Sequence, residues 1–153
     1  MKRVDNYFKE ANRHKEHMLE AKETLVLPIK DYDSLCKLEK FALNTLIFRF
    51  SKLQDLMGSK IFRAFLNFSG MATDDMSFFD ILKELEKEKV LDIDEWQFLR
   101  ELRNDIAHDY PEELDEKIEK INLFIKKSDA LLAIFNRLEA KYLEIERKRD
   151  TYH

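Results

Sequence analysis

The stretch LRNDIAHDYP, at residues 102–111, decides how the rest of the chain is organised. It closes one amphipathic segment and leads into the longest helix-like segment of the sequence. Pro111 biases Tyr110 away from helical backbone, so we expect a helix to break here. A guanidinium, a carboxamide, an imidazole and a phenol lie within the eight residues from Arg103 to Tyr110. A functional hypothesis therefore depends on this stretch.

The composition is that of one all-helical domain. The chain has 153 residues, enough for a single core, and only two glycines and two prolines interrupt it. No run of residues alternates with the period of a strand. We predict an all-α, antiparallel helical bundle of four main helices plus short ones, forming one domain over residues 1–153.

Apolar periodicity outlines the first two helices. A near seven-residue rhythm predicts a helix from about residue 3 to residue 26, which Pro28 ends. Ser34 is expected to cap a second helix running to about Met57, and Gly58 to end it as a C′ residue. The apolar stripe of this helix is broad enough to predict burial against more than one neighbour; it includes Leu38, Phe41, Leu46, Phe48, Phe50 and Leu53.

Two short helices are expected next. The strongly apolar segment 61–68 predicts a third helix, and residues 69–75 form the main loop. Ser77 followed by Asp80 resembles a capping box that opens a fourth helix, ending at about Lys89.

Similar signals define the two helices on either side of the opening stretch. Asp92 followed by Glu95 repeats the capping signal and opens a fifth helix that carries Ile106. Pro111 at a first helical position opens the last helix, whose near-heptad stripe begins at Leu114. The stretch 102–111 therefore joins the fifth helix to the last one.

Charge and hydropathy limit the possible partners. The net charge is −4, but residues 74–119 hold 17 acidic and 6 basic residues. This imbalance argues against a protein that grips nucleic acid over its whole surface, so any RNA contact is expected to be local. The sequence shows no signal peptide and no apolar run long enough for a bilayer. We expect a cytoplasmic protein without a membrane contact.

Metal chemistry finds little support. The single cysteine, Cys36, excludes an internal disulfide framework and a cysteine zinc site. His14 and His17 are three residues apart, a spacing that can bring two imidazoles together. No third ligand lies nearby, however, and Lys15 and Glu16 indicate a solvated face. We therefore expect no metal and no cofactor.

The polar groups of the opening stretch suit RNA cleavage without metal. Arg103 and His108 are five residues apart, about 140° around an ideal helix, so they converge only if the helix unwinds near His108. Asn104 shares the face of His108. The imidazole can take the proton of a ribose 2′-hydroxyl, and the guanidinium can stabilise charge on the attacked phosphate. The expected product is a 2′,3′-cyclic phosphate.

The same residues also have a purely structural interpretation. Arg103 can pair with a neighbouring acid, Asp105 or Asp109, and His108 can be an ordinary polar residue at a helix end. The charged residues of the stretch 49–55 can likewise be a solvated helix edge with weak ion pairing. Spacing alone leaves both interpretations open.

The segment RNDIAH, residues 103–108, resembles the Arg-x4-His motif of the HEPN superfamily, in which Asn after the Arg is typical. With Tyr110 it extends to Arg-x4-His-x-Tyr, which resembles the toxins of HEPN–MNT toxin–antitoxin pairs. Its position before a long last helix, in an all-α chain of this size, also fits the family. The stretch RFSKLQD, residues 49–55, looks like second-helix sequence in some members.

This resemblance implies a specific activity and its regulation. HEPN toxins are metal-independent ribonucleases and act as homodimers in which two motifs build one cleft. Arg103 and His108 would be catalytic, and Asn104 would orient or support them. A small nucleotidyltransferase antitoxin would transfer AMP from ATP onto Tyr110 and silence the toxin. Dimerisation would let each chain supply only part of the site.

Two other functions remain open at this stage. One is a non-catalytic subunit that docks onto a minimal nucleotidyltransferase and presents a nucleotide or substrate. The other is a helical adaptor in which the motif is vestigial.

Overall fold

The computed structural model describes residues 3–107 and 117–151, and these residues form helices and connecting loops without a strand. The helices, in chain order, are α1 (Arg3–Thr24), α2 (Lys37–Leu56), the π-helical turn η1 (Met57–Ile61), α3 (Phe62–Phe68), α4 (Phe78–Lys87), α5 (Ile93–Ala107) and α6 (Ile118–Thr151). The prediction of an all-α fold is therefore confirmed.

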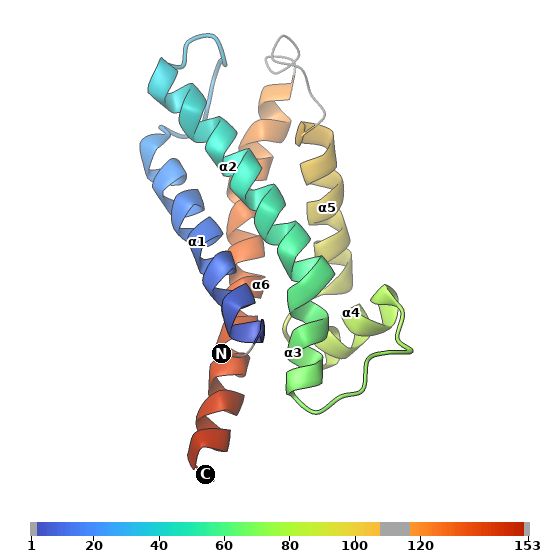
Figure 1. The fold of residues 1–153 in the computed structure, drawn as a ribbon. Helices are drawn as coiled ribbons and strands as arrows, with labels where there is room; N and C mark the ends of the chain where they lie inside the picture. Colours follow the sequence, from blue (N-terminus) through green and yellow to red (C-terminus); the bar gives the residue numbers. More distant parts are fainter. Residues whose placement is uncertain (1–2, 108–116, 152–153) are drawn as a thin grey trace.

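The four long helices α1, α2, α5 and α6 run alternately up and down beside one another (Figure 1). α2 packs against α1, α5 and α6, so it occupies a central place in the arrangement. The short helix α4 packs against α3 and α5 near the foot of the molecule (Figure 1). Across residues 3–107 and 117–151, no helix is both long and apolar enough to cross a membrane.

Local capping chemistry sets the start of α4 and α5 as predicted. The Ser77 hydroxyl accepts a hydrogen bond from the Asp80 N–H at 3.1 Å, and the Asp80 carboxylate accepts one from the Ser77 N–H, also at 3.1 Å. The Asp92 carboxylate accepts from the Glu95 N–H at 3.0 Å. The predicted start of the last helix at Pro111 lies outside the described residues.

The predicted cap of α2 is wrong. The helix begins at Lys37, and the residue before it is Cys36, whose N–H donates to the Glu39 carboxylate at 3.2 Å. The Ser34 hydroxyl instead donates to the carbonyl of Asp31 at 2.8 Å, within the preceding loop. The Ser34 side chain therefore bonds to the backbone of its own loop and does not cap the helix. Serine side chains often form such local hydrogen bonds in place of a helix cap.

Gly58 does not end α2, contrary to the sequence prediction. The chain continues through η1 directly into α3, so Lys37 to Phe68 is helical without a break. A side-chain Cβ at Gly58 would lie 3.3 Å from Cζ2 of Trp96, tighter than most such contacts. Gly58 therefore allows α5 to approach this turn closely and has no C-cap role. A π-turn inside a helix is often found near a functional site.

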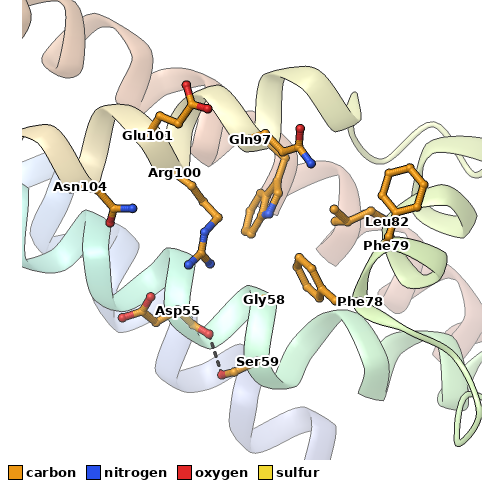
Figure 2. A pocket seen from close by; sticks show the side chains of 11 residues that line it. Asp55, Gly58, Ser59, Phe78, Phe79, Leu82, Gln97, Arg100, Glu101 and Asn104 are labelled. Carbon is orange, nitrogen blue, oxygen red and sulfur yellow. Dashed lines mark hydrogen bonds between the residues drawn. The ribbon is translucent and has the colours of Figure 1, made fainter.

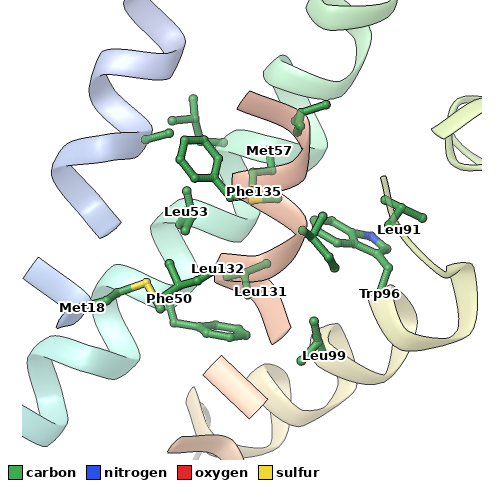
Figure 3. Close-up of a cluster of buried hydrophobic side chains, with 14 of the residues drawn as sticks. Met18, Phe50, Leu53, Met57, Leu91, Trp96, Leu99, Leu131, Leu132 and Phe135 are labelled. Carbon is green, nitrogen blue, oxygen red and sulfur yellow. The ribbon is translucent and has the colours of Figure 1, made fainter. Parts of the chain in front are cut away.

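The core lies between α6 and the surrounding long helices (Figure 3). Trp96 on α5 is fully buried and packs on Phe62, with ring centroids 4.8 Å apart. Phe50 of α2 meets Phe124 of α6 at 4.6 Å. These contacts between large rings join α2, α3, α5 and α6 into one core and hold α5 in place.

Part of the predicted α2 stripe is exposed. Leu38, Phe41 and Phe48 have relative exposures of 65%, 57% and 52%, whereas Leu46, Phe50 and Leu53 are fully buried. Lys37 lies over the Phe41 ring, and Lys52 lies over the Phe48 ring. The apolar surface of α2 is therefore wider than its buried face.

His14 is buried, not on a solvated face as the sequence suggested. Its relative exposure is 8%, and Arg49 donates to its Nδ1 at 3.1 Å. Burial lowers the pKa of His14, and the neighbouring Arg49 lowers it further. His14 therefore packs between α1 and α2 as a neutral ring. The residues that the structure describes contain no group of three or more ligands suited to a metal ion.

Candidate functional site

Arg103 lies near the end of α5 and forms a forked ion pair with α2. Its Nη1 and Nη2 donate to Oδ1 and Oδ2 of Asp55, each at 3.0 Å. The Arg103 side chain is 18% exposed and that of Asp55 is 49% exposed. Two parallel hydrogen bonds fix the plane of the guanidinium as well as its position.

Asp105, one of the two acids that the sequence offered as a partner of Arg103, contacts another residue. Asp105 accepts from Lys120 of α6 at 3.4 Å, and the Arg103 side chain reaches Asp55 on another helix. From the sequence, Asp55 was interpreted as part of a solvated helix edge or of the family-like stretch 49–55, and not as a partner of Arg103. No local signal identifies it as the partner of Arg103, because the two residues are 48 positions apart.

Of the four residues predicted for the site, two are described. Arg103 and Asn104 lie on adjacent positions of α5, close to α2. His108 and Tyr110 lie outside the described residues, as does Asp109. Arg103 and Asn104 are therefore the two predicted site residues whose contacts the structure describes.

Asn104 lines a cavity of about 680 Å³, which is enclosed by α4, by α5 and by the continuous segment of α2 and η1. Figure 2 shows its lining side chains: the Arg100 guanidinium extends from α5 toward α2, and the Phe78 ring enters the same space from the other side of Gly58. Asp55, the partner of Arg103, also lines this space. The cavity therefore begins directly beside the forked ion pair, and its volume is in the range of small-molecule sites.

The apolar wall of the cavity comes from aromatic residues on two helices. Phe78 and Phe79, at the start of α4, are 40% and 48% exposed, and Trp96 of α5 is fully buried. A Cβ at Gly58 would lie 3.7 Å from the tip of the Phe78 ring and 3.3 Å from the Trp96 ring, so both rings pack close to the bare backbone of Gly58. The capping box at Ser77 and Asp80 fixes the turn from which Phe78 projects.

The polar wall is one face of α5. Gln97, Arg100, Glu101 and Asn104 follow the spacing of three and four residues that places side chains on one helix face. None of these four side chains makes a hydrogen bond or ion pair with a described residue. Asn104 was predicted as a site residue, whereas Gln97, Arg100 and Glu101 were not, although their spacing on the helix can be read from the sequence.

One buried donor in the cavity wall lacks a partner. The indole N–H of Trp96 has no hydrogen-bond acceptor among the described residues. The ring atom nearest to a Cβ at Gly58 is Cζ2, on the same edge of the indole as the nitrogen. An orphaned buried donor is uncommon in folded proteins and calls for an explanation.

Comparisons with family models, with curated proteins and with solved structures find no match to this chain. The chemistry of the site therefore has to be argued from its residues. These offer a fixed guanidinium at Arg103, a second guanidinium at Arg100, two carboxamides and an aromatic wall. Such a set can bind an anionic ligand that carries a flat ring.

Proposed function

We propose that the chain is a metal-independent ribonuclease toxin of the HEPN type, acting as a homodimer. The proposal rests on the Arg-x4-His-x-Tyr pattern at residues 103–110 of the sequence and on the antiparallel arrangement of the long helices that the structure describes. The observation that carries it is the forked contact between Arg103 and Asp55. This contact orients the motif guanidinium before any substrate arrives, which is the condition for efficient charge stabilisation.

The reaction follows from the chemistry of the motif. His108 takes the proton of a ribose 2′-hydroxyl, and the 2′-oxygen attacks the adjacent phosphorus. The bond from phosphorus to the 5′-oxygen breaks, and that oxygen takes a proton from water. The products are a 2′,3′-cyclic phosphate and a free 5′-hydroxyl.

Arg103 can serve this reaction while it is paired. A guanidinium has five N–H donors, and the contact with Asp55 uses two of them. The others make no hydrogen bond with a described residue, and they are proposed to bind the oxygens of the phosphate. Asn104, on the next position of α5, is proposed to orient or support these groups, and Asp55 acts as a positioning residue for Arg103.

Regulation is proposed to act through Tyr110. A small nucleotidyltransferase encoded with the toxin would transfer AMP from ATP to the phenol oxygen, with release of pyrophosphate. The added phosphate is anionic and bulky, so it would compete with an RNA phosphate for the same guanidinium.

The charge balance of the same contact favours a second function. Asp55 neutralises the charge of Arg103, and a cavity of ligand size lies beside the pair. These features suit a non-catalytic subunit that binds a nucleotide or substrate for a partner nucleotidyltransferase.

Substitution of His108 separates the two functions. Expression of the wild-type chain should arrest growth, and purified protein should cut RNA in the presence of a metal chelator, leaving cyclic phosphate ends. His108→Ala should abolish both effects without altering the circular dichroism spectrum. His17→Ala, at a half-buried position on α1, is the matched control and should behave like wild type. If wild type and His108→Ala are equally harmless and neither cuts RNA, the binding subunit is favoured.

The regulatory part has its own test. The toxin is co-expressed with the nucleotidyltransferase encoded next to it, and intact mass is measured. The expected result is a mass increase of one or more AMP units that disappears in Tyr110→Phe and persists in Tyr7→Phe. An unmodified Tyr110 in the presence of active nucleotidyltransferase would rule out this regulation.

A further inference from the structure

The cavity between α2 with η1, α4 and α5 has the features of a nucleotide site. The geometry points to this cavity as the subsite for one nucleotide unit of the RNA, with its base on the Phe78 wall and its phosphate beside Arg100. This inference rests on the proposed ribonuclease function, because it names how that site would hold its substrate.

The size and shape of the cavity fit such a ligand. Its volume of about 680 Å³ is sufficient for a base, a ribose and a phosphate. Gly58 and the tip of the Phe78 ring lie close together at the floor of the cavity. The Phe78 ring is 40% exposed, so a flat ring can lie on its exposed part, and stacking of a base on an aromatic side chain is a common mode of RNA binding.

The polar face of α5 supplies the directional contacts. Gln97 and Asn104 carry carboxamides, which can donate to and accept from the edge of a base. Neither carboxamide is engaged with a described residue. The two groups flank Arg100 along the helix, so a ligand that contacts Arg100 is within the same polar face.

Arg100 is the group best suited to the phosphate. Its guanidinium points into the hollow above Gly58 (Figure 2) and forms no ion pair with a described residue. The nearby carboxylate of Asp55 is already paired with Arg103 and therefore opposes an anion less than a free carboxylate would. Glu101, also in the lining, disfavours an isolated anion such as inorganic phosphate. The site should therefore prefer a nucleotide over phosphate alone.

Trp96 allows this inference to be tested by fluorescence. Its indole ring lines the cavity beside Gly58, while its Nε1 atom is buried away from solvent and is not offered to a ligand in the cavity. Trp96 is also the only tryptophan of the chain. Its fluorescence therefore reports on this cavity without interference from another indole.

The test is a titration of the full chain with the four ribonucleoside 3′-monophosphates, followed by tryptophan fluorescence and by calorimetry. At least one nucleotide should bind saturably and change the emission of Trp96. Phe78→Ala should weaken that binding about ten-fold, the loss that removal of one stacking ring usually causes. Arg100→Gln should weaken it by a similar factor, through loss of a charged hydrogen bond. Both residues are partly exposed, so these variants should fold.

Matched controls lie on other surfaces of the bundle. Phe98→Ala removes a ring of similar exposure from α5 outside the cavity, and Lys126→Gln removes an exposed cation from α6. Both should bind the nucleotide like wild type. The inference is overturned if no nucleotide binds, if Phe78→Ala and Arg100→Gln bind like wild type, or if ribose 5-phosphate binds as tightly as the nucleotides.

The titration requires no RNA cleavage, so its result is independent of the proposed function. Nucleotide binding by a chain that never cuts RNA would leave the subsite in place and favour the non-catalytic subunit. The opposite result is RNA cleavage that requires His108, while no nucleotide binds and Phe78→Ala and Arg100→Gln cut RNA like wild type. That result would reject the subsite and leave the proposed ribonuclease function standing.

Discussion

Arg103 and Asp55 form a two-bond ion pair that joins the end of α5 to α2, with both donor–acceptor distances at 3.0 Å. A lysine at position 103 could place a charge near Asp55 but could not reproduce the fork. The pair is only half-buried on the Asp55 side, so its main effect should be on orientation, with a smaller effect on stability.

A double-mutant cycle with Arg103→Ala and Asp55→Ala measures this pair. We expect a coupling free energy of about 0.5–1 kcal/mol in chemical denaturation, at the upper end for exposed pairs because the geometry is bidentate. Lys120 and Asp105, both about half exposed and joined by one contact at 3.4 Å, are the matched control and should couple by less than about 0.5 kcal/mol. Equal coupling in the two cycles would contradict a special role for the fork.

Gln54 provides a prediction about stability. Its carboxamide is fully buried, and neither its nitrogen nor its oxygen has a partner among the described residues. Methionine has nearly the same shape and no strong polar group, so Gln54→Met should raise the free energy of unfolding by about 1–2 kcal/mol. Gln97→Met, at an exposed position, should change it by less than about 0.5 kcal/mol. A loss of stability in Gln54→Met would show that the buried amide is satisfied in the folded protein.

The elements that could be predicted are those whose causes are local. Ser77 with Asp80 and Asp92 with Glu95 are contacts within one helical turn, so spacing alone located the starts of α4 and α5. The all-α fold follows from composition and periodicity in the same way.

The elements that could not be predicted depend on residues distant in the sequence. Gly58 was expected to end a helix, but the reason for a glycine at this position is the close approach of Trp96 from α5. The partner of Arg103 was sought among neighbouring acids, whereas Asp55 comes from α2. The cavity combines residues of η1, α4 and α5, and only its polar face on α5 had a readable spacing.

His14 should make stability depend on pH. Burial lowers its pKa below the ordinary value of 6.5, and Arg49 adds to this effect; of the other nearby charges, Glu10 raises the pKa, whereas Arg13 and Lys52 lower it. The folded pKa is below the unfolded one, so the stabilisation is fully present above pH 6.5 and is lost as the pH falls through the folded pKa. Denaturation curves should therefore show falling stability just below pH 6.5, where carboxylates still titrate little.

Substitution of His14 checks the origin of this dependence. A glutamine side chain at this position would keep an acceptor for Arg49 without titrating, so His14→Gln should flatten the pH dependence in this window. His17→Gln, whose side chain is 40% exposed, should keep the wild-type dependence. An unchanged slope in His14→Gln would assign the effect to another group.

The last prediction compares Ser77, which caps α4, with Ser34, which was expected to cap α2 and does not. The Ser77 hydroxyl accepts from the Asp80 N–H, so Ser77→Ala should destabilise the protein by about 1 kcal/mol. The Ser34 hydroxyl donates to the Asp31 carbonyl in an exposed loop, so Ser34→Ala should change stability by less than about 0.5 kcal/mol. Chemical denaturation of both variants measures the difference.

Because Ser77 also fixes the turn that carries Phe78, Ser77→Ala should in addition weaken nucleotide binding in the cavity, whereas Ser34→Ala should not. Equal destabilisation by the two substitutions would mean that the start of α4 is held by the packing of its apolar face, and that its capping box contributes little.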